Sequence, residues 1–157
     1  RIERLDLPAP FAQGLDWHTT IMEADLAISF AEEYERGFDR LSARLREMIA
    51  RGRTHLAVDY ARAQGAIPAL NNALDEAFSA YDALLTPAAP GVAPVGLGST
   101  GSPVFCTLWT LCGLPAVTLP MLQNRAGLPI GVQLVGARGN DARLLRTANW
   151  LAGQVLD

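Results

Sequence analysis

The sequence contains no lysine, because all 13 of its basic residues are arginines. Arginine stays protonated inside proteins, so it cannot serve as a general base in the way that a desolvated lysine can. Any mechanism that requires a catalytic lysine must therefore take it from residues outside these 157. The absence excludes a complete lysine-assisted active site from this stretch of chain.

Cysteine and long apolar runs are also scarce. The two cysteines, Cys106 and Cys112, are six positions apart, which matches neither a C-x-x-C motif nor a zinc spacing, and two thiols make no disulfide framework. No apolar run approaches the ~20 residues of a membrane-spanning helix. The sequence starts without a methionine and without a signal-peptide pattern, so we interpret it as a piece of a longer chain. We expect a cytoplasmic protein with no membrane contact.

The overall composition is that of a folded protein. Half of the residues are hydrophobic, 18% are charged, and the net charge is −3. There is no basic patch, so a nucleic-acid partner is not expected. The length suffices for one domain of ordinary size.

The first half of the chain has the periodicity of helices. Thr20 and Glu23 fit a capping box, in which each side chain satisfies a free backbone N–H at a helix start. Apolar residues then recur every fourth position as far as Gly37, which ends the predicted helix.

Two further helices are predicted before the helical periodicity ends at about residue 81. The first covers 39–51, and Gly52 would supply its left-handed cap. The second covers 56–81. Pro68 lies inside it, which predicts two segments or a kink.

The second half of the chain reads as strands, a loop and a final helix. Short strands are predicted over 82–86, 116–119 and 130–135, with a hairpin turn at 123–127 between the last two. Asp141 would cap the final helix. A helical front with a strand-containing back predicts an α/β layer arrangement.

Three glycines in the loop fit the G-x-G-x-x-G fingerprint of a dinucleotide-binding turn: Gly96, Gly98 and Gly101. The fingerprint needs a strand that runs directly into the first glycine and an acidic residue about twenty positions later. Pro94 disfavours the strand, and Met121 and Leu122 stand where the acid should be. We therefore interpret the match as coincidental and predict no nicotinamide or other cofactor.

No other residue forms a recognisable catalytic or metal site. His18 and His55 have no carboxylate or cysteine at ligand spacing, so no metal is predicted. Ser99 and Ser102 lack the G-x-S-x-G surroundings of a nucleophile elbow.

The apolar run 104–112 is the best candidate for a substrate pocket. Hydroxyls and a tryptophan are interleaved in it, and it lies between a flexible loop and a predicted strand, where pocket walls are common. The alternative is a buried helix that packs on a sheet. The candidate pocket residues are Phe105, Cys106, Trp109 and Thr110.

Four blocks of the second half, in order and spacing, strongly resemble the C-terminal portion of amidase signature hydrolases: YDALLTP (81–87), CGLPAVTLP (112–120), LPIGVQLVG (128–136) and DARLL (141–145). The resemblance implies an α/β fold, namely the C-terminal part of the amidase signature fold, with helices packed on a mixed β-sheet. Residues 1–157 would be one segment of a single amidase domain, helical over 15–81 and strand, loop and helix over 82–157.

The resemblance also implies a chemistry. Such enzymes hydrolyse amide bonds through a serine nucleophile, a second serine on a cis peptide bond and a lysine base, and backbone N–H groups hold the oxyanion. Those residues precede the region that resembles this chain, so no catalytic residue is assigned here and the chain alone is expected to be inactive. The segment before Gly113 contributes to the pocket in the family, and Thr110 stands where asparagine is frequent.

The implied partners are a small-molecule amide substrate and the missing N-terminal part of the same enzyme, and a homo-oligomer is left open. A second hypothesis is a non-catalytic binding or assembly segment derived from an amidase.

Overall fold

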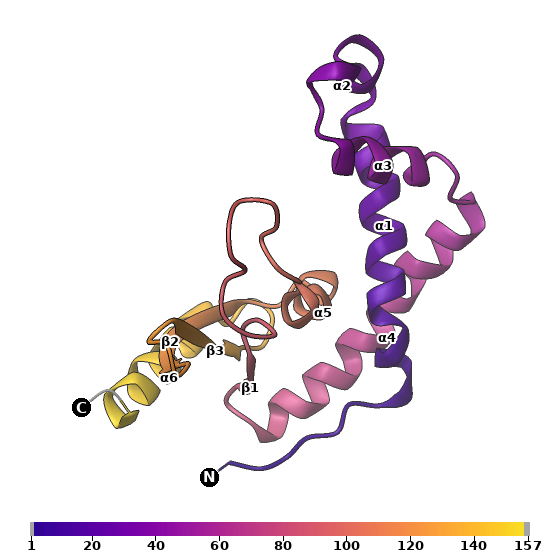
Figure 1. Ribbon diagram of the computed structural model, residues 1–157. Helices are drawn as coiled ribbons and strands as arrows, with labels where there is room; N and C mark the ends of the chain where they lie inside the picture. The colour runs from indigo at the N-terminus through magenta and orange to yellow at the C-terminus, as the bar shows by residue number, and fades with distance from the viewer. Residues whose placement is uncertain (1, 156–157) are drawn as a thin grey trace. The chain divides into compact units, whose positions relative to one another are not determined.

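The computed structural model describes residues 2–155. The chain divides into two compact units, Arg1–Pro68 and Ala69–Asp157, here called the N-terminal unit and the C-terminal unit. The first contains helices, and the second combines helices with a three-stranded sheet (Figure 1). This combination confirms the predicted α/β class.

The N-terminal unit is built from consecutive helices: η1 (Ala9–Gln13), α1 (Gly14–Ser29), α2 (Ala31–Arg36), η2 (Phe38–Arg40), α3 (Ala43–Gly52) and the first part of α4 (Ala57–Ala80). Helices α1 and α3 pack against each other. Helix α3 begins after Ser42, whose Oγ accepts a hydrogen bond from the Leu45 backbone N–H at 3.2 Å. This cap explains why α3 starts later than the 39–51 pattern predicts.

The predicted capping box is wrong, because Thr20 and Glu23 lie inside α1. The 3-10 turn η1 leads directly into Gly14, so the helix has already begun well before Thr20. The Thr20 hydroxyl donates to the Asp16 carbonyl at 3.0 Å, which is the usual bond of a threonine in a helix interior.

The predicted left-handed cap at Gly52 is also wrong, since Gly52 is the last residue of α3 and has no positive φ. A Cβ at this position would lie 1.9 Å from the Glu23 carbonyl oxygen of α1. Glycine is therefore required by the close approach of the two helices rather than by the backbone conformation.

Helix α4 runs without interruption through Pro68, so the predicted division into two segments does not occur. A proline removes one N–H and one hydrogen bond, which a helix of this length withstands when packing supports it. Leu70 and Leu74 are almost completely buried just after the proline and provide such packing.

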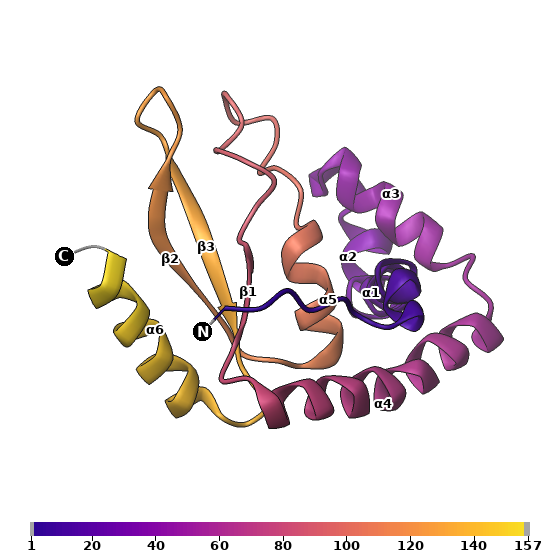
Figure 2. The same ribbon diagram turned by 90° about the horizontal axis from the view of Figure 1, so that it is seen from below.

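The sheet of the C-terminal unit has the order β1-β3-β2, with β1 at Leu84–Pro87, β2 at Ala116–Gln123 and β3 at Pro129–Val135. Both pairings are antiparallel, so the mixed sheet that we expected is not found among the described residues. A short hairpin joins β2 to β3 and permits only antiparallel pairing. Figure 2 shows these two strands side by side up to their turn.

The hairpin turn confirms the prediction for 123–127. The Asn124 side-chain oxygen accepts hydrogen bonds from the backbone N–H groups of Ala126 and Leu128, both at 2.9 Å. Gly127 has a φ of 78°, which favours glycine. Pro120 is tolerated in β2 because β2 lies at an edge of this sheet.

Two helices complete the C-terminal unit, α5 (Val104–Cys112) and α6 (Asp141–Val155). Helix α6 packs against β2 and β3 and buries Leu144 and Ala148. The final helix begins at Asp141 itself, and the Asn140 carbonyl accepts from the Leu144 N–H, so Asn140 takes the capping position that was predicted for Asp141. Among residues 2–155, no helix combines the length and apolar character needed to cross a membrane.

Candidate functional site

Helix α5 carries all four residues predicted for the pocket, and its ends have clear local causes. Pro103 precedes the first turn, where the Ser102 hydroxyl oxygen accepts from the Val104 N–H at 3.4 Å. Gly113 ends the helix in the left-handed conformation with a φ of 66°.

The four predicted residues divide between two faces of α5. Cys106 and Thr110 are exposed, and they are one helical turn apart, with the Thr110 hydroxyl donating to the Cys106 carbonyl at 3.1 Å. Phe105 is half-buried and Trp109 is buried. The helix therefore presents an exposed face with a thiol and a hydroxyl, and anchors itself through its aromatic residues.

Trp109 has an unusual polar atom. Its side chain is only 6% exposed, and within the described part of the chain its indole N–H has no hydrogen-bond partner. Leaving a buried donor without an acceptor costs about 1–3 kcal/mol. An acceptor oxygen from outside these residues would remove that cost.

Gln133 of β3 is a buried amide next to α5 that the sequence reasoning missed. Its Nε2 donates to the Phe105 carbonyl at 2.9 Å and to the Thr86 hydroxyl at 3.0 Å, and its Oε1 accepts from the Cys106 thiol at 3.6 Å. The sequence did contain one indication of this role, because Gln133 is the only polar side chain in the otherwise apolar segment 129–135. Such a polar residue needs buried partners.

A second buried amide lies at the other end of α5. In the orientation of the Asn71 side chain that satisfies both of its polar atoms, its nitrogen donates to the Cys112 carbonyl at 3.0 Å and its oxygen accepts from Arg138 Nη1 at 2.8 Å. The Cys112 thiol is buried, and this burial raises its pKa to about 11, while the charge of Arg138 acts in the opposite direction.

The glycine-rich loop before α5 lacks the directly flanking strand and helix that a dinucleotide site needs. Strand β1 ends at Pro87, well before Gly96, and α5 begins only at Val104. The hydroxyl oxygen of Ser99 accepts from the Gly101 backbone N–H at 3.1 Å, and no basic side chain bonds to it in the described part of the chain. This loop contains no activated nucleophile.

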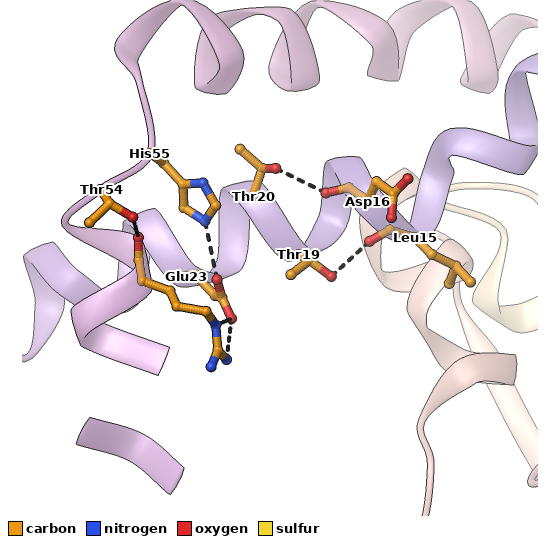
Figure 3. A network of polar contacts seen from close by, with 8 residues as sticks. Leu15, Asp16, Thr19, Thr20, Glu23, Thr54 and His55 are labelled. Atoms are coloured by element: carbon orange, nitrogen blue, oxygen red, sulfur yellow. Dashed lines mark hydrogen bonds and ion pairs between the residues drawn. The ribbon is translucent and has the colours of Figure 1, made fainter. Parts of the chain in front are cut away.

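The N-terminal unit holds a network of charged residues around Glu23 (Figure 3). The Glu23 side chain is buried; Arg51 donates to its Oε1 from Nε at 2.8 Å and from Nη2 at 2.6 Å, and His55 Nε2 donates to its Oε2 at 3.1 Å. No carboxylate stands at ligand spacing from His55 in the sequence, and the fold brings Glu23 to it from 32 positions away, which the sequence reasoning did not foresee.

The pKa of Glu23 reflects opposing causes. Burial alone would raise it, but the hydrogen bonds and charges of Arg51 and His55 outweigh burial and hold the pKa below its ordinary value. The hydrogen bond to Glu23 raises the pKa of Arg51 in turn. All the polar atoms of the carboxylate are engaged inside the fold, so this network is a structural support between α1 and α3.

Within residues 2–155, no group of three or more potential ligands is placed to hold a metal ion.

The chain matches known proteins over most of its length. The Amidase family model matches residues 15–145. A glutamyl-tRNA(Gln) amidotransferase subunit from Wolinella succinogenes is 39% identical over 84 residues, which are 49% of this chain and 18% of that protein.

Two solved structures extend the comparison to the fold. One described as an amidase is 26% identical with a TM-score of 0.85, and the match covers 95% of this chain and 37% of that one. A glutamyl-tRNA(Gln) amidotransferase subunit from Thermotoga maritima is 25% identical with a TM-score of 0.65, covering 93% and 33% respectively. The matched region is thus a minor part of each relative.

Proposed function

The chain belongs to the amidase family, and on that premise we propose that it forms the substrate-pocket part of a serine amidase that hydrolyses carboxylic amide bonds. The complete enzyme would act on a small-molecule amide in the cytoplasm. Residues 1–157 would be one segment of a single amidase domain, and the partner that completes it would be the N-terminal part of the same enzyme.

The bond-breaking residues of the proposed enzyme lie upstream of this chain. The sequence offers no lysine for a serine–cis-serine–lysine triad. Ser99 accepts from the Gly101 backbone N–H and Ser102 from that of Val104, and within residues 2–155 no basic side chain bonds to either hydroxyl. The 157 residues alone should therefore hydrolyse no amide, and turnover that a serine-directed reagent abolishes would refute this.

The unpartnered indole N–H of Trp109 is the observation that carries the proposed pocket. It is a buried donor on α5, and the exposed Thr110 directly follows it, while the exposed Cys106 lies about one helical turn before it. An amide substrate brings a carbonyl oxygen, which is the acceptor that such a donor lacks. We therefore propose that Trp109, with Phe105, Cys106 and Thr110, lines the substrate pocket.

Substitution of Trp109 in the complete enzyme tests the pocket. Trp109→Phe removes the N–H and keeps an aromatic ring, and Trp109→Ala also removes the ring. The first should lower kcat/KM for all amides, and the second should in addition change the ratio of kcat/KM between small and bulky amides. Trp150→Phe is the matched control, since Trp150 is 60% exposed on α6. An unchanged ratio in Trp109→Ala would remove Trp109 from the pocket.

The second candidate is a non-catalytic binding or assembly segment derived from an amidase. It is favoured by the lack of a lysine and of any serine paired with a base in the described residues. The coding sequence upstream of Arg1 separates the two. An open frame that encodes a lysine and a Gly-Ser-Ser-Gly stretch supports the enzyme, and a start codon close to Arg1 supports the assembly segment.

A further inference from the structure

We propose that Gln133 and Asn71 are positioning residues that hold the two ends of α5 and thereby fix the pocket side chains between them. This inference rests on the proposed function only in its second part, the effect on substrate choice. Its first part, the attachment of the helix ends, is a statement about the C-terminal unit alone.

Gln133 holds the first turn of α5. It is 3% exposed, and both of its side-chain polar atoms are occupied, by the Phe105 carbonyl, the Thr86 hydroxyl and the Cys106 thiol. These partners lie on α5 and β1, while Gln133 belongs to β3. One amide therefore joins the start of the helix to two strands of the sheet. An apolar replacement would remove the Gln133 donor from the Phe105 carbonyl and the Thr86 hydroxyl, while the Cys106 thiol would keep the Ala88 carbonyl as an acceptor at 3.7 Å.

Asn71 holds the last turn of α5. The Cys112 carbonyl is among the last four of the helix, which have no donor within the helix. The Asn71 amide supplies that donor at 3.0 Å, and its oxygen is held by Arg138, which in turn pairs with Asp75 at 3.4 Å. Asn71 belongs to α4, so this end of α5 is attached to a different element from the first.

The residues between the two attachments are those proposed for the pocket. A displacement of about 1 Å at a reacting group can lower a rate by about a hundredfold. Loosening either end of α5 should therefore change how Cys106, Trp109 and Thr110 meet a substrate. The effect should depend on substrate size, because the helix forms a wall rather than the reacting groups.

Hydrogen exchange in the complete enzyme tests the attachment at each end. Gln133→Met should speed exchange of the Cys106 and Thr107 amides, which bond to the Pro103 carbonyl. Asn71→Leu should instead speed exchange of the Gly113 and Leu114 amides. Each increase should be about five- to tenfold, as expected for the loss of a net hydrogen-bond contribution.

The specificity of these changes decides the first part of the proposal. Gln123→Met is the matched control, because Gln123 is exposed at the end of β2 of the same sheet. If either variant speeds hydrogen exchange equally at both ends of α5, or at neither end, the proposed attachment is overturned. If Gln133→Met does not fold, Thr86→Val removes one of the two acceptors and should still accelerate the Cys106 amide about two- to threefold.

Thiol labelling gives a second readout of the same end. Cys106 is exposed and Cys112 is buried, so alkylation followed by peptide mapping reports on Cys106 with Cys112 as an internal reference. Gln133→Met should raise the Cys106 labelling rate several-fold while Asn71→Leu leaves it close to wild type. The reverse order would overturn the assignment of Gln133 to the first turn.

The kcat/KM ratio for a small and a bulky amide tests the second part. Both variants should shift the ratio, whereas a merely structural role would lower kcat/KM equally for both substrates. End-specific exchange with an unchanged ratio would overturn the effect on substrate choice. A wild-type enzyme with no amide turnover would defeat the proposed function itself, while the exchange and labelling results would still decide the attachment.

Discussion

The two units of this chain support their helices with opposite kinds of buried polar group. In the N-terminal unit a buried carboxylate, Glu23, joins α1 to α3 through Arg51 and His55. In the C-terminal unit two neutral amides, Gln133 and Asn71, hold α5. When a carboxylate is protonated, it becomes neutral and one of its oxygens carries a hydrogen and becomes a donor. A side-chain amide does not change its protonation in this way. The N-terminal unit should therefore respond to acid at this network, and the Gln133 attachment of α5, which contains no carboxylate, should not.

A substitution at the close contact between α1 and α3 should cause the largest loss of stability among the variants that compare the two units. Gly52→Ala places a Cβ where the Glu23 carbonyl oxygen lies 1.9 Å away, so the helices must separate. We expect a loss of about 3 kcal/mol in the free energy of unfolding, the upper range for overpacking. Urea unfolding with hydrogen exchange over 14–52 measures it.

A second glycine gives the matched control for this substitution. Gly65 is exposed within α4, and nothing lies within 4 Å of the Cβ that alanine would add. Gly65→Ala should stabilise the N-terminal unit by about 0.5–1 kcal/mol. Equal effects of the two alanines would contradict the close helix contact.

Removal of the Glu23 charge should have the next largest effect. Glu23→Gln keeps the shape but weakens the charge-assisted hydrogen bonds from Arg51 and His55, so we expect a loss of about 2 kcal/mol at neutral pH. Glu32→Gln is the control, since the Glu32–Arg36 pair is exposed. Chemical denaturation at neutral pH should separate the two variants clearly.

The pH dependence of the same network follows from the direction of the Glu23 pKa. Because folding lowers this pKa, the carboxylate contributes stability that is present above the ordinary value of 4.5 and is lost as the pH falls through the lower folded value. Wild type should therefore lose its advantage over Glu23→Gln on acidification below that range. Parallel stability curves for the two proteins between neutral and acidic pH would contradict this.

The hairpin of the C-terminal unit should show a smaller, charge-independent effect. Asn124→Ala removes the acceptor of two backbone hydrogen bonds in the turn, which should cost about 1 kcal/mol. Asn124→Asp keeps an acceptor oxygen and should lose less. Thermal unfolding compares the two, and a larger loss for aspartate would show that charge governs this turn after all.

The smallest effect should come from the exposed ion pair between Arg143 and Asp82. Both side chains are largely open to solvent, so Arg143→Ala should change the free energy of unfolding by about 0.5 kcal/mol or less. This change in the free energy of unfolding should be smaller still in high salt, because salt screens exposed charges. If Arg143→Ala lowered the free energy of unfolding as much as Glu23→Gln does, charged pairs would stabilise both units equally, which would contradict the comparison.

Local chemistry made part of this fold predictable. The glycine at 113 and the asparagine–glycine turn near 124–127 act within a few residues, so their conformations follow from the sequence itself. The final helix at Asp141 follows from its periodicity in the same way. The late start of α3 depended on a single cap at Ser42, which the apolar pattern alone did not reveal.

The features that were missed depend on residues far apart in the chain. The partners of Glu23 and the bonds of Gln133 connect positions about 30 or more residues apart, and no periodicity encodes them. The need for glycine at position 52 likewise arises only when α1 lies against α3. For the candidate pocket, the sequence identified the helix, and the buried amides that hold it became visible only in three dimensions.

The uncharged stretch from 83 to 124 should make the unfolded chain prone to self-association. Charged residues that flank apolar segments keep unfolded molecules apart, and this stretch has none to act as such gatekeepers. Its prolines, at positions such as 90, 94 and 120, are the remaining interruptions to intermolecular strand pairing. Refolding from denaturant should therefore succeed best in dilute solution, where self-association of this segment is slower than collapse onto its own core.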